Sequence, residues 1–188
     1  MIATNTALAG ALMRALPAQI DLVQVNSFLA GFLHPIEGID HIVAMVTVGV
    51  WGAITGGRAL WIWPLAFVSM MLGGFMAAVA GLSLPWTTAA IFSSVVVLAL
   101  MVALAVRAPV WVGAVIVGLF AFFHGHAHGT EATAASLSMY AAGFALATAG
   151  LHVAGIAVGL AAQRSMGLAT VRAIGAAALL GGVVWMVA

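Results

Sequence analysis

The chain has 188 residues, of which 65% are hydrophobic and only 5% are charged, and its mean hydropathy is +1.26. A soluble domain carries about 25% charged residues, so this composition excludes a water-exposed globular surface and indicates a membrane protein. The formal net charge of +1 gives no reason to expect a nucleic-acid partner. The absence of cysteine excludes disulfides and thiolate metal sites. No nucleotide-binding motif is present, so any transport would have to use a gradient or a partner's energy.

Six apolar segments are long enough to be considered as membrane spans, since a spanning helix needs about 20 apolar residues. Short polar or Gly/Pro-containing breaks separate them, and Pro85 and Pro109 stand at or just before segment starts, where a missing N–H costs little. The sequence therefore predicts an all-α, polytopic membrane protein with six transmembrane helices. The predicted spans are residues 27–53, 59–80, 86–106, 109–126, 133–162 and 168–187.

Residues 1–26 precede the first predicted span and contain Arg14. A secretory signal peptide starts with a basic region ahead of its apolar run, and none precedes the apolar residues here. We interpret residues 1–26 as an N-terminal leader or interfacial segment, and residues 27–188 as one transmembrane domain of six helices.

The arginines predict the orientation of these helices in the membrane. Loops one, three and five, with the start of the last helix, carry all the basic residues that follow Arg14, whereas loops two and four carry none. Basic loops stay in the cytoplasm, so both termini are expected on the outer, periplasmic side. The residues concerned are Arg58, Arg107, Arg164 and Arg172.

The first cluster of ionisable residues lies within the first predicted span. Such residues cost about 2.5–3.5 kcal/mol each at the centre of a membrane helix, so they require a reason. At helical spacing His34, Glu37 and His41 share one face, with Asp40 beside them. Pro35 predicts a kink or break near His34. The competing interpretation is a hydrogen-bonded network that only fixes helix packing.

The second cluster, at the end of the fourth predicted span, contains His124, His126, His128 and Glu131. In a helix His124 and His128 share a face and His126 points away, whereas an extended chain would place all three on one side. The competing interpretation is a solvated histidine-rich loop. Because the first and fourth spans run in opposite directions, both clusters are expected at the outer end of the membrane.

Imidazole and carboxylate ligands together suit borderline divalent ions such as Ni²⁺, Co²⁺ or Zn²⁺, and the lack of thiolate disfavours Cu(I). Histidine must be neutral to bind a metal, so binding should weaken as the pH falls through about 6.5. Asp40 beside His41 could orient the imidazole instead of contacting the metal. We predict capture by His124, His128, Glu131 and His34, followed by transfer to Asp40 and His41.

His152 is a lower-ranked candidate in the fifth predicted span. A lone histidine there is more often a helix–helix hydrogen bond than a ligand on the way out. Phe67 is interpreted as a packing residue.

The two clusters resemble the signatures of the HupE/UreJ family of bacterial nickel/cobalt permeases. His34, Asp40 and His41 match the first motif, and the second is matched by Phe123, His124, Gly125, Ala127, His128, Gly129 and Glu131. His126 falls on a variable position of the second motif. The resemblance implies six spans in a bacterial inner membrane and uptake of Ni²⁺ or Co²⁺ as substrate, with no prosthetic group. The chain departs from some relatives in having no acid between Asp40 and Glu131.

Two other functions use the same ligands. Three histidines and an acid could hold Zn²⁺ with an activated water, as in an intramembrane zinc-dependent hydrolase. A metal sensor or maturation partner would bind the ion without moving it. A transporter should spread its ligands along a path, whereas a hydrolase should gather three of them around one open position.

Overall fold

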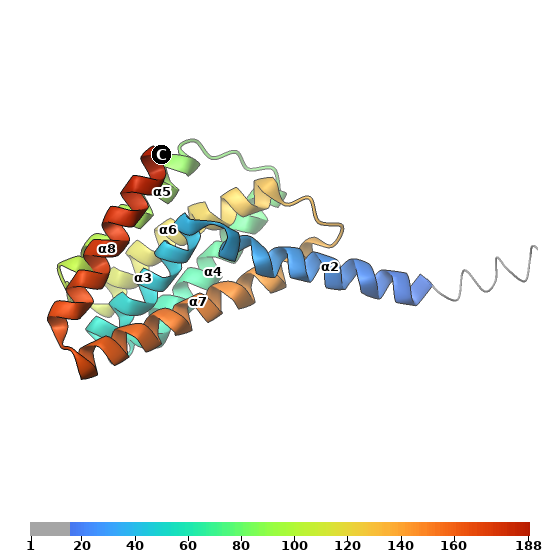
Figure 1. The fold of residues 1–188 in the computed structure, drawn as a ribbon. Helices are drawn as coiled ribbons and strands as arrows, with labels where there is room; N and C mark the ends of the chain where they lie inside the picture. The colour runs from blue at the N-terminus through green and yellow to red at the C-terminus, as the bar shows by residue number, and fades with distance from the viewer. Residues whose placement is uncertain (1–15) are drawn as a thin grey trace, which may run out of the picture.

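The computed structural model describes residues 16–188, and these residues form seven α-helices joined by short connections (Figure 1). The predicted all-α fold is confirmed for this part of the chain. Residues 1–15 lie outside the described residues, and α2 runs through position 26, so the proposed division at 26/27 stays a prediction. The helices are α2 (Leu16–Glu37), α3 (Ile39–Thr55), α4 (Ala59–Val79), α5 (Thr87–Ala103), α6 (Val110–Glu131), α7 (Leu137–Ser165) and α8 (Leu168–Val187).

The first predicted span is a sharply bent pair of helices, with an angle of 81° between the stretch Leu22–Glu37 and Ile39–Thr55. The expected kink near His34 is wrong in position: α2 continues through Pro35 and breaks at Gly38. A Cβ atom on Gly38 would lie 2.7 Å from His41 Nδ1 and 2.8 Å from Asp40 Oδ1. Only glycine leaves room for these two side chains to meet directly beside the bend.

By length and composition, four helices could each cross a membrane, namely α4, α6, α7 and α8, and the bent pair α2–α3 could provide a fifth span. The apolar helix α5 has 17 residues and is shorter than a typical span. Each of the six predicted segments is therefore helical for most of its length, while the number that cross the bilayer stays a prediction.

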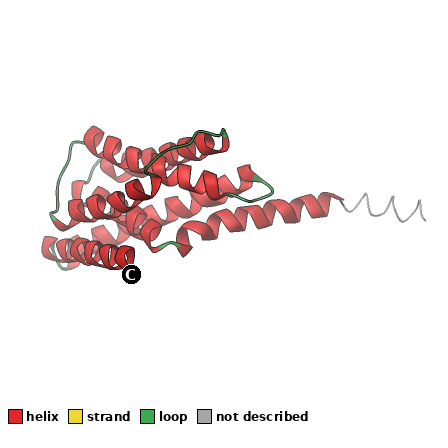
Figure 2. Cartoon of the chain, turned by 90° about the horizontal axis from the view of Figure 1, so that it is seen from above, coloured by secondary structure: helices red, strands yellow, loops and turns green. Residues whose placement is uncertain are grey.

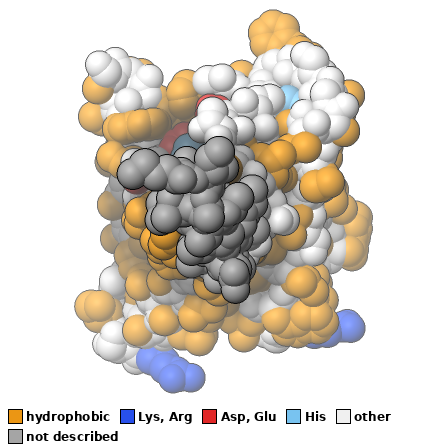
Figure 3. All heavy atoms as spheres, turned by 90° about the vertical axis from the view of Figure 1, so that its right-hand side faces the viewer, with side chains coloured by type: hydrophobic (Ala, Val, Ile, Leu, Met, Phe, Trp, Pro, Cys, Tyr) orange, Lys and Arg blue, Asp and Glu red, His pale blue; other side chains and the backbone are white. Residues whose placement is uncertain are grey.

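Apolar side chains cover much of the outside of the bundle (Figure 3). Exposed examples on three helices are Val115, Leu119, Leu146, Val153, Leu180 and Val184. A soluble monomer rarely leaves such extensive apolar surface in water, so these faces are suited to lipid. The chain is a multi-pass membrane protein by this surface and by the apolar length of its helices.

The helices lie closely packed side by side in one bundle (Figure 2). In the best-packed pairs α4 lies along α6, α3 along α7 and α5 along α8. Glycine permits the closest crossing. A Cβ on Gly74 of α4 would overlap the Phe122 carbonyl of α6, and one on Gly125 would overlap the Met71 carbonyl of α4. Small residues at such crossings let the backbones of membrane helices touch. Because Gly125 lies between His124 and His126, this crossing fixes where the second histidine cluster stands along the axis of the bundle.

Two adjacent glycines of α4 provide a matched test of this packing. We expect Gly74→Ala to destabilise the protein by about 1–3 kcal/mol, because the new methyl meets backbone atoms that cannot move aside. Gly73→Ala should instead be neutral or stabilising by about 0.5–1 kcal/mol, since open space surrounds Gly73 and alanine favours the helix. Thermal unfolding of the detergent-solubilised variants measures both effects. Equal melting temperatures for the two variants would contradict this view of the α4–α6 crossing.

The two ends of the bundle differ in chemistry. Connections α3–α4, α5–α6 and α7–α8 lie at one end, with Arg58, Arg107 and Arg164 in or next to them. Figure 3 shows basic side chains at its lower edge, and acidic and histidine side chains in the upper part of the same face. Among the residues whose side chains the structure describes, the charged groups are thus separated by sign along the helix axes.

Candidate metal site

The second histidine cluster is helical, as one of the two alternatives predicted. Within α6, His124 and His128 are one turn apart on the face that meets α2 and α3. His126 points the other way, and its Nε2 donates a 2.7 Å hydrogen bond to the Leu82 carbonyl in the α4–α5 connection. His126 makes no ring contact with the other histidines and its visible contact anchors a connection, but it lines one cavity together with Asp40 and His41.

Four imidazoles from the two clusters form a continuous row. The ring centres of His34 and His128 are 4.6 Å apart, and those of His128 and His41 are 4.5 Å apart. The His41 and His124 rings follow at 5.1 Å. Residues separated by nearly a hundred positions in the chain thus converge inside the bundle, as the opposite directions of the two helices predicted.

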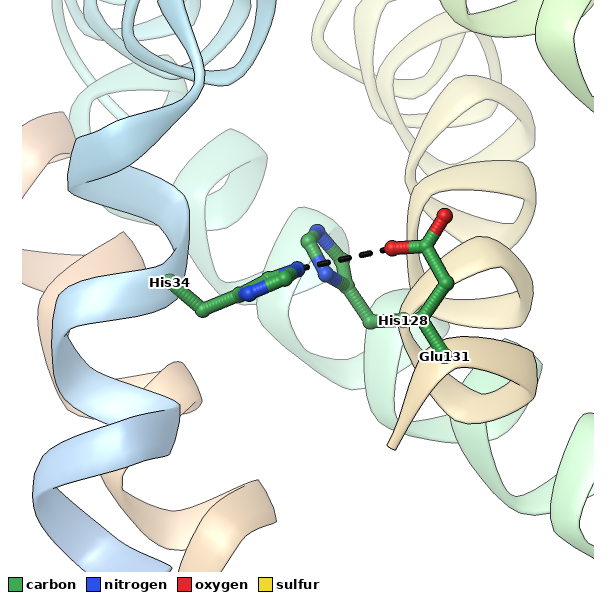
Figure 4. Close-up of side chains that lie close together, drawn as sticks. All are labelled: His34, His128 and Glu131. Atoms are coloured by element: carbon green, nitrogen blue, oxygen red, sulfur yellow. Dashed lines mark ion pairs between the residues drawn. The ribbon is translucent and has the colours of Figure 1, made fainter. Parts of the chain in front are cut away.

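The more exposed end of this row carries three side chains that could share a metal ion (Figure 4). One ligand atom each from His34, His128 and Glu131 lies within 4.8 Å of the other two. His34 Nε2 and Glu131 Oε2 are 3.5 Å apart, and the two side chains are 34% and 63% exposed. Neighbouring ligand atoms of a tetrahedral metal site stand about 3.4 Å apart, so side-chain rotations that draw these three atoms together would let one cation bridge the group.

Deeper in the row, His41 is held by its neighbour in sequence. Its Nδ1 lies 2.7 Å from Asp40 Oδ1, and the same carboxylate oxygen accepts the His41 backbone N–H at 2.9 Å. An ionised carboxylate only accepts, so Nδ1 is the donor and Nε2 presents its lone pair. Asp40 is therefore placed to orient the imidazole, which was the alternative to its prediction as a direct ligand, and it also lies favourably in the first turn of α3.

His124 is fixed in the same way by a different acceptor. Its Nδ1 donates to the Phe120 carbonyl, one turn earlier in α6, at 3.0 Å. His41 Nε2 and His124 Nε2 are both buried without a hydrogen-bond partner, as are both ring nitrogens of His128. An unpaired buried polar atom costs about 1–3 kcal/mol, and these ring nitrogens are not committed to a protein acceptor or donor and are free to bind a cation.

The structure corrects two details of the predicted arrangement. The predicted capture group placed His124 with Glu131, whereas His124 lies beyond His41 at the inner end of the row. Glu37 was predicted on one face with His34 and His41, but the 81° bend at Gly38 turns it away from His41. Glu37 is exposed and lines a cavity of about 380 Å³ beside His34 and Glu131.

A second cavity, of about 680 Å³, opens on the other side of the α6 C-terminus and reaches Asp40, His41 and Glu131. Its far wall carries hydroxyl groups that the sequence reading did not single out: Ser83, Thr87 and Thr88. The smaller cavity is likewise lined by Tyr140, which was also missed. Tyr140 is the one tyrosine in the chain and could have been noticed for that reason. Glu131 borders both cavities and is the common element of the two openings.

His152 lies off the row, on α7, with Phe67 of α4 between it and His124. The Phe67 ring is 5.8 Å from the His124 ring and 4.8 Å from the His152 ring. The predicted helix–helix hydrogen bond of His152 is not seen among the described residues, because neither ring nitrogen has a partner.

Below Phe67 the bundle is closed by apolar packing. Trp51 and Trp63 pack at a tilt of 39° with ring centres 4.3 Å apart, and their indole N–H groups donate to the Val106 and Val110 carbonyls. Both rings are fully buried. The histidine row therefore opens to the acidic end of the molecule and is sealed from the arginine end.

Comparisons with known proteins agree with the two motifs. The family model described as "HupE / UreJ protein" matches residues 5–185. "Protein HupE" of Rhizobium leguminosarum bv. viciae is 43% identical over 187 residues, which cover 98% of this chain and 96% of that protein. No solved structure gives a significant match.

Proposed function

This chain belongs to the HupE/UreJ family, and on that premise we propose that it transports Ni²⁺ or Co²⁺ across the bacterial inner membrane without nucleotide hydrolysis. The resemblance seen in the two motifs is thus confirmed at the level of the family. The ion itself is the substrate, and the ligands are side chains of α2, α3 and α6.

The observation that carries this proposal is the row of imidazoles with unpaired nitrogens. Glu131, His34 and His128 offer a first group of ligands near the cavities, and His41 and His124 continue inward at ring separations of 4.5 and 5.1 Å. Successive ligands at this spacing let a cation exchange one ligand at a time. Neutral imidazole and carboxylate bind Ni²⁺ and Co²⁺ well without the thiolates that would retain softer ions.

The charge distribution supports import rather than export. The arginine-bearing end is assigned to the cytoplasm by the positive-inside rule, so the cavities and acidic side chains face the periplasm. An external cation would then meet Glu131 and Glu37 first and be attracted by their charge. We propose six spans on the same basis, with the bent pair α2–α3 as the first and the short helix α5 as the third.

The hydrolase alternative is less well supported. HupE/UreJ is not an enzyme family. His34, His128 and Glu131 have the composition of some catalytic zinc sites, but His41 and His124 extend the ligand set away from the opening. Ligands spread in this way suit passage of an ion better than activation of one bound water.

Reconstituted vesicles test the proposed function directly. Wild-type protein in proteoliposomes that enclose a metal-sensitive dye should admit external Ni²⁺ and Co²⁺ faster than protein-free liposomes. The double variant Asp40→Asn, His41→Ala should reduce uptake to the protein-free rate, because it removes the central imidazole and the carboxylate that orients it. Equal uptake by wild type and this variant would end the proposed mechanism.

The proposed orientation has a separate test. Alkaline phosphatase fused after Ala188 should be active in a bacterial host, because the enzyme folds only in the periplasm, where the C-terminus is expected. A fusion in the α5–α6 connection beside Arg107 should be inactive. The reverse pattern would contradict the proposed direction of transport.

A further inference from the structure

The buried imidazole of His152 is not used by the row of histidines described above. Its side chain is 0% exposed, and neither Nδ1 nor Nε2 has a hydrogen-bond partner among the described residues. By contrast, His41, His124 and His126 each commit one ring nitrogen to an oxygen acceptor. His128 also has two unpaired nitrogens, but it lies at the centre of the ligand row.

An imidazole with two unpaired nitrogens is an expensive residue for packing. Leaving a buried polar group unpaired costs about 1–3 kcal/mol, and an apolar side chain of similar volume would avoid that cost. The backbone carbonyl of His152 packs against Gly49 of α3. His152 thus lies in close helix packing, where an apolar residue would stabilise the bundle better, and its imidazole requires another explanation.

His152 lies where a cation that leaves His124 would meet its next imidazole ligand. It is 15 residues from Leu137 and 13 residues from Ser165 in α7, so it lies near the middle of the helix, about 20 Å from either end. The Phe67 ring lies close to both imidazoles, with its centre 5.8 Å from that of His124 and 4.8 Å from that of His152. A single aromatic side chain separates this imidazole from the inner end of the row.

Two weaker ligands lie near this position. Thr148 precedes His152 by one helical turn and is also fully buried, with its hydroxyl 3.5 Å from the Met71 sulfur. An imidazole, a hydroxyl and a thioether provide neutral donors, which bind a divalent cation less tightly than a carboxylate group would. Weak binding suits a position that must release its ion.

We propose that His152 is an inner ligand site for the transported divalent cation, reached from His124 past the side chain of Phe67. This inference rests on the proposed function, because it extends the same path towards the cytoplasm. His152 is then one ligand beyond the row, and it is the last ligand that the ion binds before the apolar layer of Trp51 and Trp63.

Two substitutions separate a ligand from a packing residue. His152→Leu fills much of the same volume and removes both nitrogens, so a packing role would survive it. We expect this variant to lower Ni²⁺ uptake by at least about tenfold, as the loss of a supporting ligand does. Equilibrium binding of Ni²⁺ to the detergent-solubilised protein should stay within about twofold of wild type, since the outer group is unchanged.

His152→Cys supplies a different ligand in a chain that contains no other cysteine. Thiolate favours softer ions such as Zn²⁺ over Ni²⁺, so this variant should retain uptake and shift the Ni²⁺-to-Zn²⁺ ratio towards Zn²⁺ by about tenfold. Met45→Leu, a volume-conserving exchange at a fully buried position of α3, is the control and should change neither uptake nor the ratio.

The outcomes distinguish this inference from the proposed function. Absence of Ni²⁺ and Co²⁺ uptake by the wild type would refute the proposed function itself. If the wild type takes up Ni²⁺ and His152→Leu keeps that rate within about twofold, His152 is a packing residue and the inference is overturned. The same conclusion follows if both His152→Leu and His152→Cys change the rate but neither shifts the ratio of Ni²⁺ to Zn²⁺ uptake.

Discussion

An Asp40→Asn variant is expected to take up Ni²⁺ about 10–100-fold more slowly than the wild type. Asparagine keeps the shape of the side chain but removes the charge that holds the His41 Nδ1–H at 2.7 Å. The imidazole would lose both its fixed orientation and part of its basicity at Nε2. Initial rates of Ni²⁺ entry into proteoliposomes measure the effect.

The comparison with His41→Ala shows whether Asp40 acts through the imidazole. If it does, the double variant should be no slower than His41→Ala alone, because the carboxylate has nothing left to orient. Gly38→Ala should also slow Ni²⁺ uptake, because its methyl group would lie against the side chains of both Asp40 and His41. Independent, multiplying effects of Asp40→Asn and His41→Ala would instead make Asp40 a direct ligand.

A His128→Ala variant should reduce Ni²⁺ uptake by about 100-fold or more, beyond the effect of losing a supporting group. Its ring lies 4.6 Å from that of His34 and 4.5 Å from that of His41, so its imidazole joins the outer group to the inner part of the row. Its loss also leaves Glu131 and His34 as a two-ligand group. Uptake and equilibrium Ni²⁺ binding should therefore fall together.

His126 provides a matched control on the same helix. It is buried like His128, and it hydrogen-bonds Leu82 instead of facing the row. His126→Gln can keep a donor near that carbonyl, so its uptake should stay within about threefold of wild type. If His126→Gln and His128→Ala were equally inactive, loss of any buried histidine of α6 would explain the defect, and the special place of His128 would be refuted.

The sequence by itself determined the class of protein and the chemistry available to it. Membrane helices form wherever the chain is apolar for long enough, and this depends on local composition, so the helical segments could be read directly. Ionisable side chains have a high free-energy cost in lipid, so His34, Asp40, His41, His128 and Glu131 could be identified as candidates without knowledge of the fold. The spacing of His124 and His128, with His126 facing away, followed from helical geometry alone.

Tertiary structure decided how these groups meet. The bend at Gly38 lies directly beside the Asp40–His41 contact, and it separates Glu37 from His41 although helical spacing had placed them on one face. The order of the row depends on where α3 and α6 stand in the bundle, which is set by their packing on α7 and α4, so His124 lies beside His41 and not beside Glu131. The position of His152 behind Phe67 likewise requires α4 and α7 to be in place. Local periodicity fixes which face a side chain occupies, but only long-range packing fixes what that face meets.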